Sequence, residues 1–451
     1  MARESFGSGF GVLVAMAGSA VGLGNLWRFP YLVGTNGGAA FIIIYLAFVL
    51  LLAMPIMYSE FIIGRRSQAN VFGAYKVLAP NTKWCNVGLV YVLASLCIIS
   101  FYCVVGGWTL DYFWKALTFQ FSTPDTAMLG NMFNATVTSS TEPLVFMLLF
   151  LLVTALIVMA GIKDGIERYT KVMMPILFVI VIIVAIRSVT LPGAAAGLEF
   201  LFRPDFSKVT ANTILDALGQ AFFSLSLGMG CLSTYASYFG SDTQMGKTAL
   251  SVGVIDTMVA ILAGLIIFPA AFSVGIQPDA GPSLIFITLP NVFQQAFGGV
   301  PFLAMIFSLM FYVLLALAAL TSTISLHEVV TAYLNEQFGM SRGRAAVWVT
   351  GFCVVTGVLS SLSLGVWDDK FFGLGFFDLL DFVTAKLMLP LSGLLVSLFV
   401  GWYLKRSLSY EELTNYGLQK APYFPIYMFI LRYLAPIAIV LIFVNELGWL
   451  S

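Results

Sequence analysis

Several residues between Phe10 and Thr35 are types that an unbroken membrane helix disfavours. The span is otherwise apolar, and at 26 residues it exceeds the roughly 20 that cross a hydrocarbon core. It contains three glycines, an amide, a guanidinium and an imino acid: Gly18, Gly22, Gly24, Asn25, Arg28 and Pro30. Backbone groups freed inside a membrane are costly unless they line a cavity. The pattern predicts a helix broken near Ala20–Gly24, with carbonyls that suit Na⁺ and amides that suit a carboxylate.

The same glycines allow a plainer interpretation. Gly18 and Gly22 are four residues apart, which is the spacing of small residues where two membrane helices pack closely. For an arbitrary membrane helix this would be the commoner explanation. Asn25 and Arg28 favour the functional interpretation, because polar residues inside a membrane usually mark a site.

Two further spans carry related signals. Residues 223–231 read FSLSLGMGC, with Ser and Gly where a lipid-facing helix would have Leu or Val. Gly-interrupted spans in the two halves of a chain point to a transport site between them. In another span Pro175 follows Gly165 by ten positions, which fits a helix start followed by a kink.

The composition is that of an all-α polytopic membrane protein. Of 451 residues, 60% are hydrophobic and 10% are charged, and the net charge of zero gives no reason to expect a nucleic-acid partner. We predict eleven helices, at 10–35, 39–64, 84–118, 143–161, 166–187, 209–239, 244–275, 301–337, 343–363, 373–404 and 421–447. Lys and Arg concentrate on one side, which predicts a cytoplasmic N-terminus and an extracytoplasmic C-terminus.

Nothing in the sequence predicts an enzyme. His327 is the only histidine, and although Glu328 follows it, the zinc-protease pattern fails because Thr331 stands where a second histidine would be needed. We find no nucleophile–base pair and no set of metal ligands for catalysis.

Residues 18–41 read GSAVGLGNLWRFPYLVGTNGGAAF, which closely resembles helix 1 of the neurotransmitter:sodium symporter family, bacterial amino-acid branch. The chain is most like the eleven-helix multi-hydrophobic amino acid transporters. The resemblance implies a leucine-transporter-type 5+5 inverted repeat in a bacterial inner membrane, with helices 1 and 6 broken mid-membrane. The implied units are residues 1–188 (helices 1–5), 189–404 (helices 6–10) and 405–451 (a cytoplasmic loop and helix 11). Members of the family usually have twelve helices and we expect eleven here, which puts the family's dimer contacts in doubt and leaves the oligomeric state open.

The resemblance also implies two sodium sites built from oxygen ligands. The first uses a carbonyl, an amide, a hydroxyl and a carboxylate, from Ala20, Asn25, Ser224 and Asp256. The second uses three carbonyls and two hydroxyls, from Gly18, Val21, Ala318, Thr321 and Ser322. Alone, the hydroxyls of the second set would more often be interpreted as bonding back to the carbonyl four residues earlier.

Asp256 departs from the chloride-dependent members, which resemble this chain but carry Asn there and a Ser where this chain has Ala260. We therefore expect Asp256 to supply the negative charge that chloride supplies elsewhere, so that no chloride is needed. Tyr45 and Gln220 match the rest of that region. A further hypothesis is that Asp256 takes up a proton in the empty carrier.

The implied substrate site holds an amino acid between the two helix breaks. Gly22 stands where monoamine carriers have Asp, which leaves room for a substrate with its own carboxylate. The expected contacts are Ala20, Gly22, Leu23, Gly24, Ile98, Tyr102, Phe223, Ser226, Met229, Thr323 and Leu326. The apolar members favour hydrophobic side chains. Without the resemblance, Ile98, Met229 and Leu326 would be interpreted as core residues.

Gates are implied on both sides of that site. The outer gate would be an ion pair and an aromatic lid: Arg28 with Asp381, and Tyr102 with Phe223. The inner gate would be a second pair with aromatic support: Arg3 with Glu336, and Phe6 with Tyr238. Gly165 and Pro175 would let the inner half of helix 5 unwind, and Glu60 would hold the break in helix 6. Such ion pairs can also be purely structural, and Glu60 can equally be a solvated acid near Arg65.

The sequence thus predicts a sodium-coupled, chloride-independent symporter that imports neutral hydrophobic L-amino acids, aliphatic and aromatic, across a lipid bilayer. Two alternatives remain at this stage: a proton-coupled amino-acid carrier, and an amino-acid sensor that does not transport.

Overall fold

The computed structural model describes residues 4–121, 125–275, 284–296, 300–367 and 373–446, and every element in these ranges is a helix. The first five predicted spans are α1 (Gly9–Ala20) with α2 (Phe29–Thr35), α3 (Ala39–Phe48) with α4 (Met54–Ser67), α6 (Cys85–Leu117), α8 (Glu142–Met159) and α9 (Arg168–Val189). The other six are α11 (Ala211–Ser224) with α12 (Cys231–Ala236), α13 (Met245–Ser273), α15 (Pro301–Phe338), α16 (Arg342–Leu362), α17 (Phe376–Asp381) with α18 (Leu389–Leu398), and α20 (Phe424–Phe429) with α21 (Ala435–Glu446).

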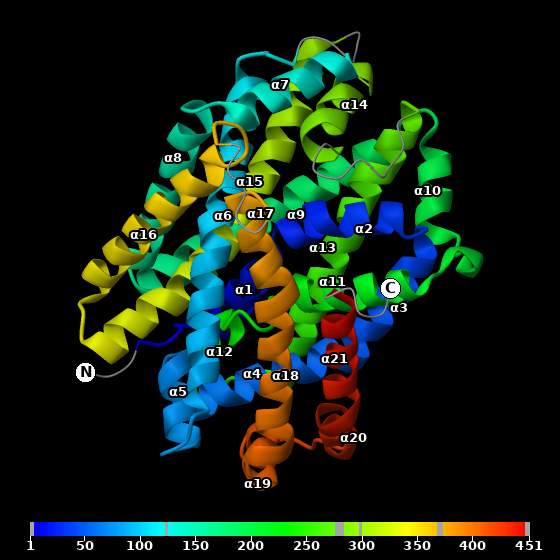
Figure 1. The fold of residues 1–451 in the computed structure, drawn as a ribbon. Coiled ribbons are helices and arrows are strands. Elements are labelled where there is room, and N and C mark those ends of the chain that lie inside the picture. The colour runs from blue at the N-terminus through cyan, green and yellow to red at the C-terminus, as the bar shows by residue number, and fades with distance from the viewer. Residues whose placement is uncertain (1–3, 122–124, 276–283, 297–299, 368–372, 447–451) are drawn as a thin grey trace.

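Shorter helices lie in the connections. They are α5 (Val71–Leu78), α7 (Thr126–Thr138), α10 (Ala194–Phe202), α14 (Leu289–Ala296) and α19 (Arg406–Leu413). In Figure 1, α7 and α14 lie at one end of the bundle, and α5 and α19 lie at the other, nearer the N-terminus. This arrangement agrees with the predicted separation of outer and cytoplasmic loops.

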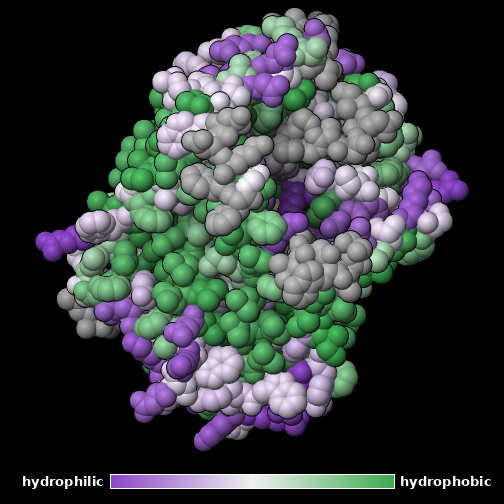
Figure 2. All heavy atoms as spheres, viewed as in Figure 1, coloured by the Kyte–Doolittle hydropathy of each residue, from purple (hydrophilic) through white to green (hydrophobic). Residues whose placement is uncertain are grey.

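The predicted helix count agrees with the structure. Within the described residues, nine helical stretches are long and apolar enough to cross a membrane, and α1 with residues Gly24–Thr35 forms a tenth span bent by 48°. The remaining span is α11 and α12, which residues 225–230 separate. Figure 2 shows hydrophobic side chains over the middle of one face and hydrophilic side chains toward its ends, as a bilayer requires.

Turns of π-helix adjoin α-helices at seven places in the described residues. They lie at Gly24–Arg28, Val49–Ala53, Ile162–Glu167, Leu284–Thr288, Phe382–Met388, Phe399–Tyr403 and Ile430–Leu434. A π turn carries an extra residue and leaves a gap in the normal hydrogen-bond pattern, and such turns often occur at functional sites.

Helix 5 is wound in this structure. The π turn Ile162–Glu167 runs directly into α9, and Pro175 lies inside that helix. A Cβ atom at Gly165 would overlap with the Ile157 carbonyl oxygen, so close packing already requires glycine at this position. Unwinding between Gly165 and Pro175 therefore remains a prediction.

Candidate functional site

Helix 1 is interrupted where the glycines predicted. The α1 helix ends at Ala20, Val21 has extended backbone with ψ of 104°, and helical structure resumes by Gly24. The backbone N–H of Gly22 donates to Asn25 Oδ1 at 3.1 Å, and the Gly22 carbonyl accepts from the backbone N–H of Asn25 at 3.1 Å. Asn25 therefore supports the break as well as lining it.

Helix 6 is interrupted beside it. Ser226, Gly228 and Gly230 have left-handed φ angles of 53°, 77° and 79°. The Ser226 hydroxyl donates to the Ser19 carbonyl at 2.8 Å and so connects the two breaks. At Gly228 a Cβ atom would lie 2.7 Å from the Leu389 carbonyl oxygen, so both the backbone angle and the space require glycine.

A buried carboxylate fixes the break in helix 6. Glu60 is fully buried, and its Oε1 accepts from the Gly228 amide at 2.8 Å. The hydroxyls of Tyr91 and Ser233 reach the same carboxylate at 3.4 and 3.3 Å. The interpretation of Glu60 as a solvated acid is therefore wrong.

The side chains of the first predicted sodium site lie together. Asn25 Nδ2 donates to Asp256 Oδ1 at 2.7 Å and to Ser224 Oγ at 3.1 Å, and Ser224 Oγ donates to Asp256 Oδ2 at 2.8 Å. Tyr45 approaches Asp256 Oδ2 at 3.4 Å. These partners of the buried carboxylate are all neutral, and a buried charge is costly without a counter-charge. The donor set therefore fits a cation such as Na⁺.

The second predicted site lies between the end of α1 and the middle of α15. Thr321 Oγ1 lies 3.5 Å from the Val21 carbonyl and 3.1 Å from the Ala318 carbonyl. It also bonds to the Leu317 carbonyl four residues earlier, as the alternative interpretation had it. A Cβ atom at Gly18 would lie 3.3 Å from Thr321 Cβ. Gly18, Val21, Ala318 and Thr321 therefore lie close together.

Ser322 is oriented differently from Thr321. Its hydroxyl lies 3.5 Å from the Ser19 carbonyl and belongs to the lining of the central cavity.

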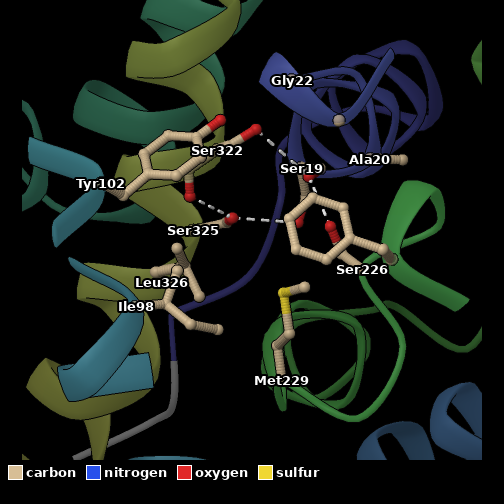
Figure 3. Close-up of a pocket in the computed structure, with 12 residues that line it drawn as sticks. Ser19, Ala20, Gly22, Ile98, Tyr102, Ser226, Met229, Ser322, Ser325 and Leu326 are labelled. Carbon is tan, nitrogen blue, oxygen red and sulfur yellow. Dashed lines mark hydrogen bonds between the residues drawn. The ribbon is translucent and has the colours of Figure 1, made fainter. Parts of the chain in front are cut away.

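A small cavity of about 30 Å³ lies between the two helix breaks on one side and helices α6 and α15 on the other (Figure 3). That is room for about two water molecules, and far less than an amino acid needs. Nine residues of the predicted substrate site line it: Ala20, Gly22, Gly24, Ile98, Tyr102, Phe223, Ser226, Met229 and Leu326. Of the other two, Leu23 donates its amide to the Tyr102 hydroxyl at 3.0 Å, and Thr323 is buried and bonds to the Ala319 carbonyl.

The lining also contains serines that our sequence analysis missed as substrate contacts: Ser19, Ser322 and Ser325. Ser19 Oγ donates to Ser325 Oγ at 2.9 Å. Ser322 and Ser325 lie on the same face of α15 as the predicted contact Leu326, since the three residues follow helical spacing. A search for hydroxyls on that face would therefore have found both serines. Figure 3 shows Gly22, Ser322 and Tyr102 at one end and Ile98, Met229 and Leu326 at the other.

Tyr102 and Phe223, the two aromatic residues predicted for the outer gate, both line this cavity. The Arg28 guanidinium stacks over the Phe223 ring, 4.7 Å from its centroid, and Asp381 is close enough to interact electrostatically with Arg28. The predicted ion pair between Arg28 and Asp381, and its role with Tyr102 as an outer gate, stay predictions.

Glu328, an acid to which the sequence analysis gave no role, contacts Tyr238, one of the residues predicted for the inner gate. Phe6 packs edge-on against Tyr235 and Tyr238, and the Tyr238 hydroxyl donates to Glu328 Oε1 at 2.7 Å. Glu328 is fully buried and forms an ion pair with Arg342.

Glu336, the predicted partner of Arg3, accepts from the backbone and side chain of Asn70, each at 2.8 Å. Arg3 itself lies outside the described residues, so the predicted pair remains a prediction. The role of Glu328 was missed because only its place in a zinc motif was considered. An ionisable residue inside a long apolar helix was the usable signal.

Comparisons with known proteins agree with this geometry. A model described as "Sodium:neurotransmitter symporter family" matches residues 3–134 and 128–450. An uncharacterized sodium-dependent transporter, YhdH of Bacillus subtilis (strain 168), is 40% identical over 446 residues, covering 98% of both chains. A similar transporter from Haemophilus influenzae is 35% identical and covers 99% of this chain and 98% of its own. The crystal structure of MhsT in complex with L-phenylalanine has a TM-score of 0.91 and 42% identity, covering 99% of this chain and 100% of that one.

Proposed function

The chain belongs to the sodium:neurotransmitter symporter family, and from this premise we propose that it imports neutral hydrophobic L-amino acids, aliphatic and aromatic. The sodium gradient drives uptake, and substrate gains access alternately from the two sides of a bacterial inner membrane. The N-terminus is cytoplasmic and the C-terminus extracytoplasmic.

The observation that carries this proposal is the polarity of the central cavity. At its polar end a Cβ atom on Gly22 would overlap with the Ser322 hydroxyl and lie 3.0 Å from the Tyr102 hydroxyl. An acidic side chain from the protein has no room there, which favours a substrate that brings its own carboxylate. The opposite end offers Ile98, Met229 and Leu326 to an apolar side chain. The related MhsT was solved with L-phenylalanine, a ligand of this kind.

Binding requires the cavity to expand from about 30 Å³. Met229 follows a glycine and precedes another in the non-helical segment, and its unbranched side chain adapts to different shapes. We infer that movement of this segment admits side chains of different size, which supports a broad hydrophobic specificity.

We infer two sodium ions per cycle, one at each predicted site. The substrate carboxylate joins Ala20, Asn25, Ser224 and Asp256 at the first, so that each ligand strengthens the binding of the other. Asp256 already provides a fixed negative charge there, which makes chloride unnecessary. Gly18, Val21, Ala318, Thr321 and Ser322 hold the second ion.

The test is uptake of radiolabelled L-Phe, L-Leu and L-Trp into proteoliposomes. An inward Na⁺ gradient is compared with K⁺, each with chloride and with gluconate. Accumulation that requires Na⁺ and survives gluconate is the expected result. Sodium-independent accumulation driven by a pH gradient would favour the proton-coupled carrier, and binding without accumulation would favour the sensor.

A further inference from the structure

We propose that the inner-leaflet end of α13 binds one phospholipid with a primary-ammonium head group, of the phosphatidylethanolamine type. Two cavities outside the predicted substrate and sodium sites carry this inference. One is polar and lies at the cytoplasmic end of α13. The other is apolar and lies farther along the same helix.

The polar cavity has a volume of about 410 Å³. Its walls are the segment Phe6–Leu13 and the connection from Gly240 into the first turns of α13. Lys247 and Asp242 both line it, and within the described residues neither forms an ion pair. The cavity thus presents one cation and one anion, together with the hydroxyls of Thr248 and Ser251.

These charges match a zwitterionic head group. A phosphodiester needs a cation and hydrogen-bond donors, which Lys247 and the two hydroxyls supply. A primary ammonium needs an acceptor, which the Asp242 carboxylate supplies. Choline has no N–H to donate, and glycerol has no positive charge. Neither head group can therefore donate a charge-assisted hydrogen bond to the Asp242 carboxylate, as a primary ammonium can.

The apolar cavity accommodates an acyl chain. It has a volume of about 440 Å³ and lies between α13 and the helix 2 residues Leu46, Val49, Leu50 and Met54. Nearly all of its surface is hydrocarbon. The π turn Val49–Ala53 forms part of this wall.

An exposed stripe on α13 connects the two cavities. Lys247, Leu250, Val254 and Met258 recur at helical spacing, and the three apolar side chains are 54%, 57% and 43% exposed. The rise from Lys247 to Met258 is about 16 Å at 1.5 Å per residue. That is about half of a hydrocarbon core of roughly 30 Å, the depth that one leaflet's acyl chain occupies.

Native mass spectrometry of the purified full chain tests the proposal. The protein is incubated separately with phosphatidylethanolamine, phosphatidylglycerol and phosphatidylcholine. We expect one phosphatidylethanolamine to be retained more strongly than the other two lipids. Lys247→Gln should weaken retention about two- to fivefold, the effect of one exposed ion pair. Asp242→Asn should remove the preference for phosphatidylethanolamine.

Val254→Trp fills the apolar cavity and should abolish retention. Two matched changes should leave it unaltered: Lys83→Gln at another exposed cytoplasmic lysine, and Val355→Trp at a valine that is 61% exposed on α16. L-Phe binding by each variant confirms that it is folded. Equal retention of all three lipids, or wild-type retention by both Lys247→Gln and Val254→Trp, would overturn the proposal. Displacement of the lipid by phosphoethanolamine in water would instead identify a site for a soluble ligand.

Discussion

The carboxylate of Glu167 on helix 5 accepts a hydrogen bond from the Gly7 amide at 2.6 Å. It also accepts from the Ser8 hydroxyl at 2.9 Å and from Lys171 at 2.6 Å. Gly11 has no side chain where a Cβ atom would overlap with this carboxylate. One acid therefore fastens the N-terminal segment to the part of helix 5 that is expected to unwind.

Replacing Glu167 with Gln should loosen this attachment. The N-terminal segment loses charge-assisted hydrogen bonds, which are worth about 1 kcal/mol more each than neutral ones. We expect amide hydrogen exchange in residues 6–13 and 162–168 to accelerate about five- to tenfold. Glu411→Gln, at an exposed acid elsewhere in the chain, is the matched control. Unchanged exchange would mean that Glu167 does not restrain the segment.

Asp256→Asn should lower the apparent affinity for Na⁺ in uptake. Among the described residues the buried carboxylate has only neutral hydrogen-bond partners, so removing its charge removes the counter-charge for the ion. We expect a loss of about ten- to a hundredfold, which is typical of a nearby opposite charge. Combining this change with Ala260→Ser should make uptake respond to chloride. Wild-type Na⁺ affinity in Asp256→Asn would contradict the assignment of the first site.

Gly22→Ala should impair substrate binding without unfolding the protein. Its Cβ atom would overlap with the Ser322 hydroxyl at the polar end of the cavity. Overpacking costs about 1–3 kcal/mol, so L-Phe affinity should fall about tenfold or more. Gly219→Ala on α11 is the matched control, because its Cβ atom would meet nothing within 4 Å. Equal affinities in scintillation proximity binding would argue against substrate at this end.

Local sequence chemistry was sufficient to locate the two helix breaks, whereas most of the residues that line the cavity were predicted from the resemblance to a known family. The sequence marks Gly22 and Gly228 as positions of a break, but the contacts that require glycine there, with Ser322 and with the Leu389 carbonyl, are seen only in the structure. The pairing of Tyr238 with Glu328, and of Ser19 with Ser325, joins residues that are 90 and 306 positions apart. Such partners depend on how the helices pack and on the rotamers selected, and neither follows from periodicity. The small volume of the cavity, about 30 Å³, likewise depends on how the helices pack.

The contribution of the Glu328–Arg342 ion pair to stability can be tested by double substitution. Arg342→Gln leaves Glu328 buried without its cation, which costs about 3–5 kcal/mol in comparable buried pairs. Thermal unfolding should therefore shift to a clearly lower temperature. Glu328→Gln combined with Arg342→Gln should recover much of that stability, since a neutral amide still accepts from the Tyr238 hydroxyl. If the double variant is no more stable than Arg342→Gln alone, the arginine acts through its bond to the Val158 carbonyl rather than through Glu328.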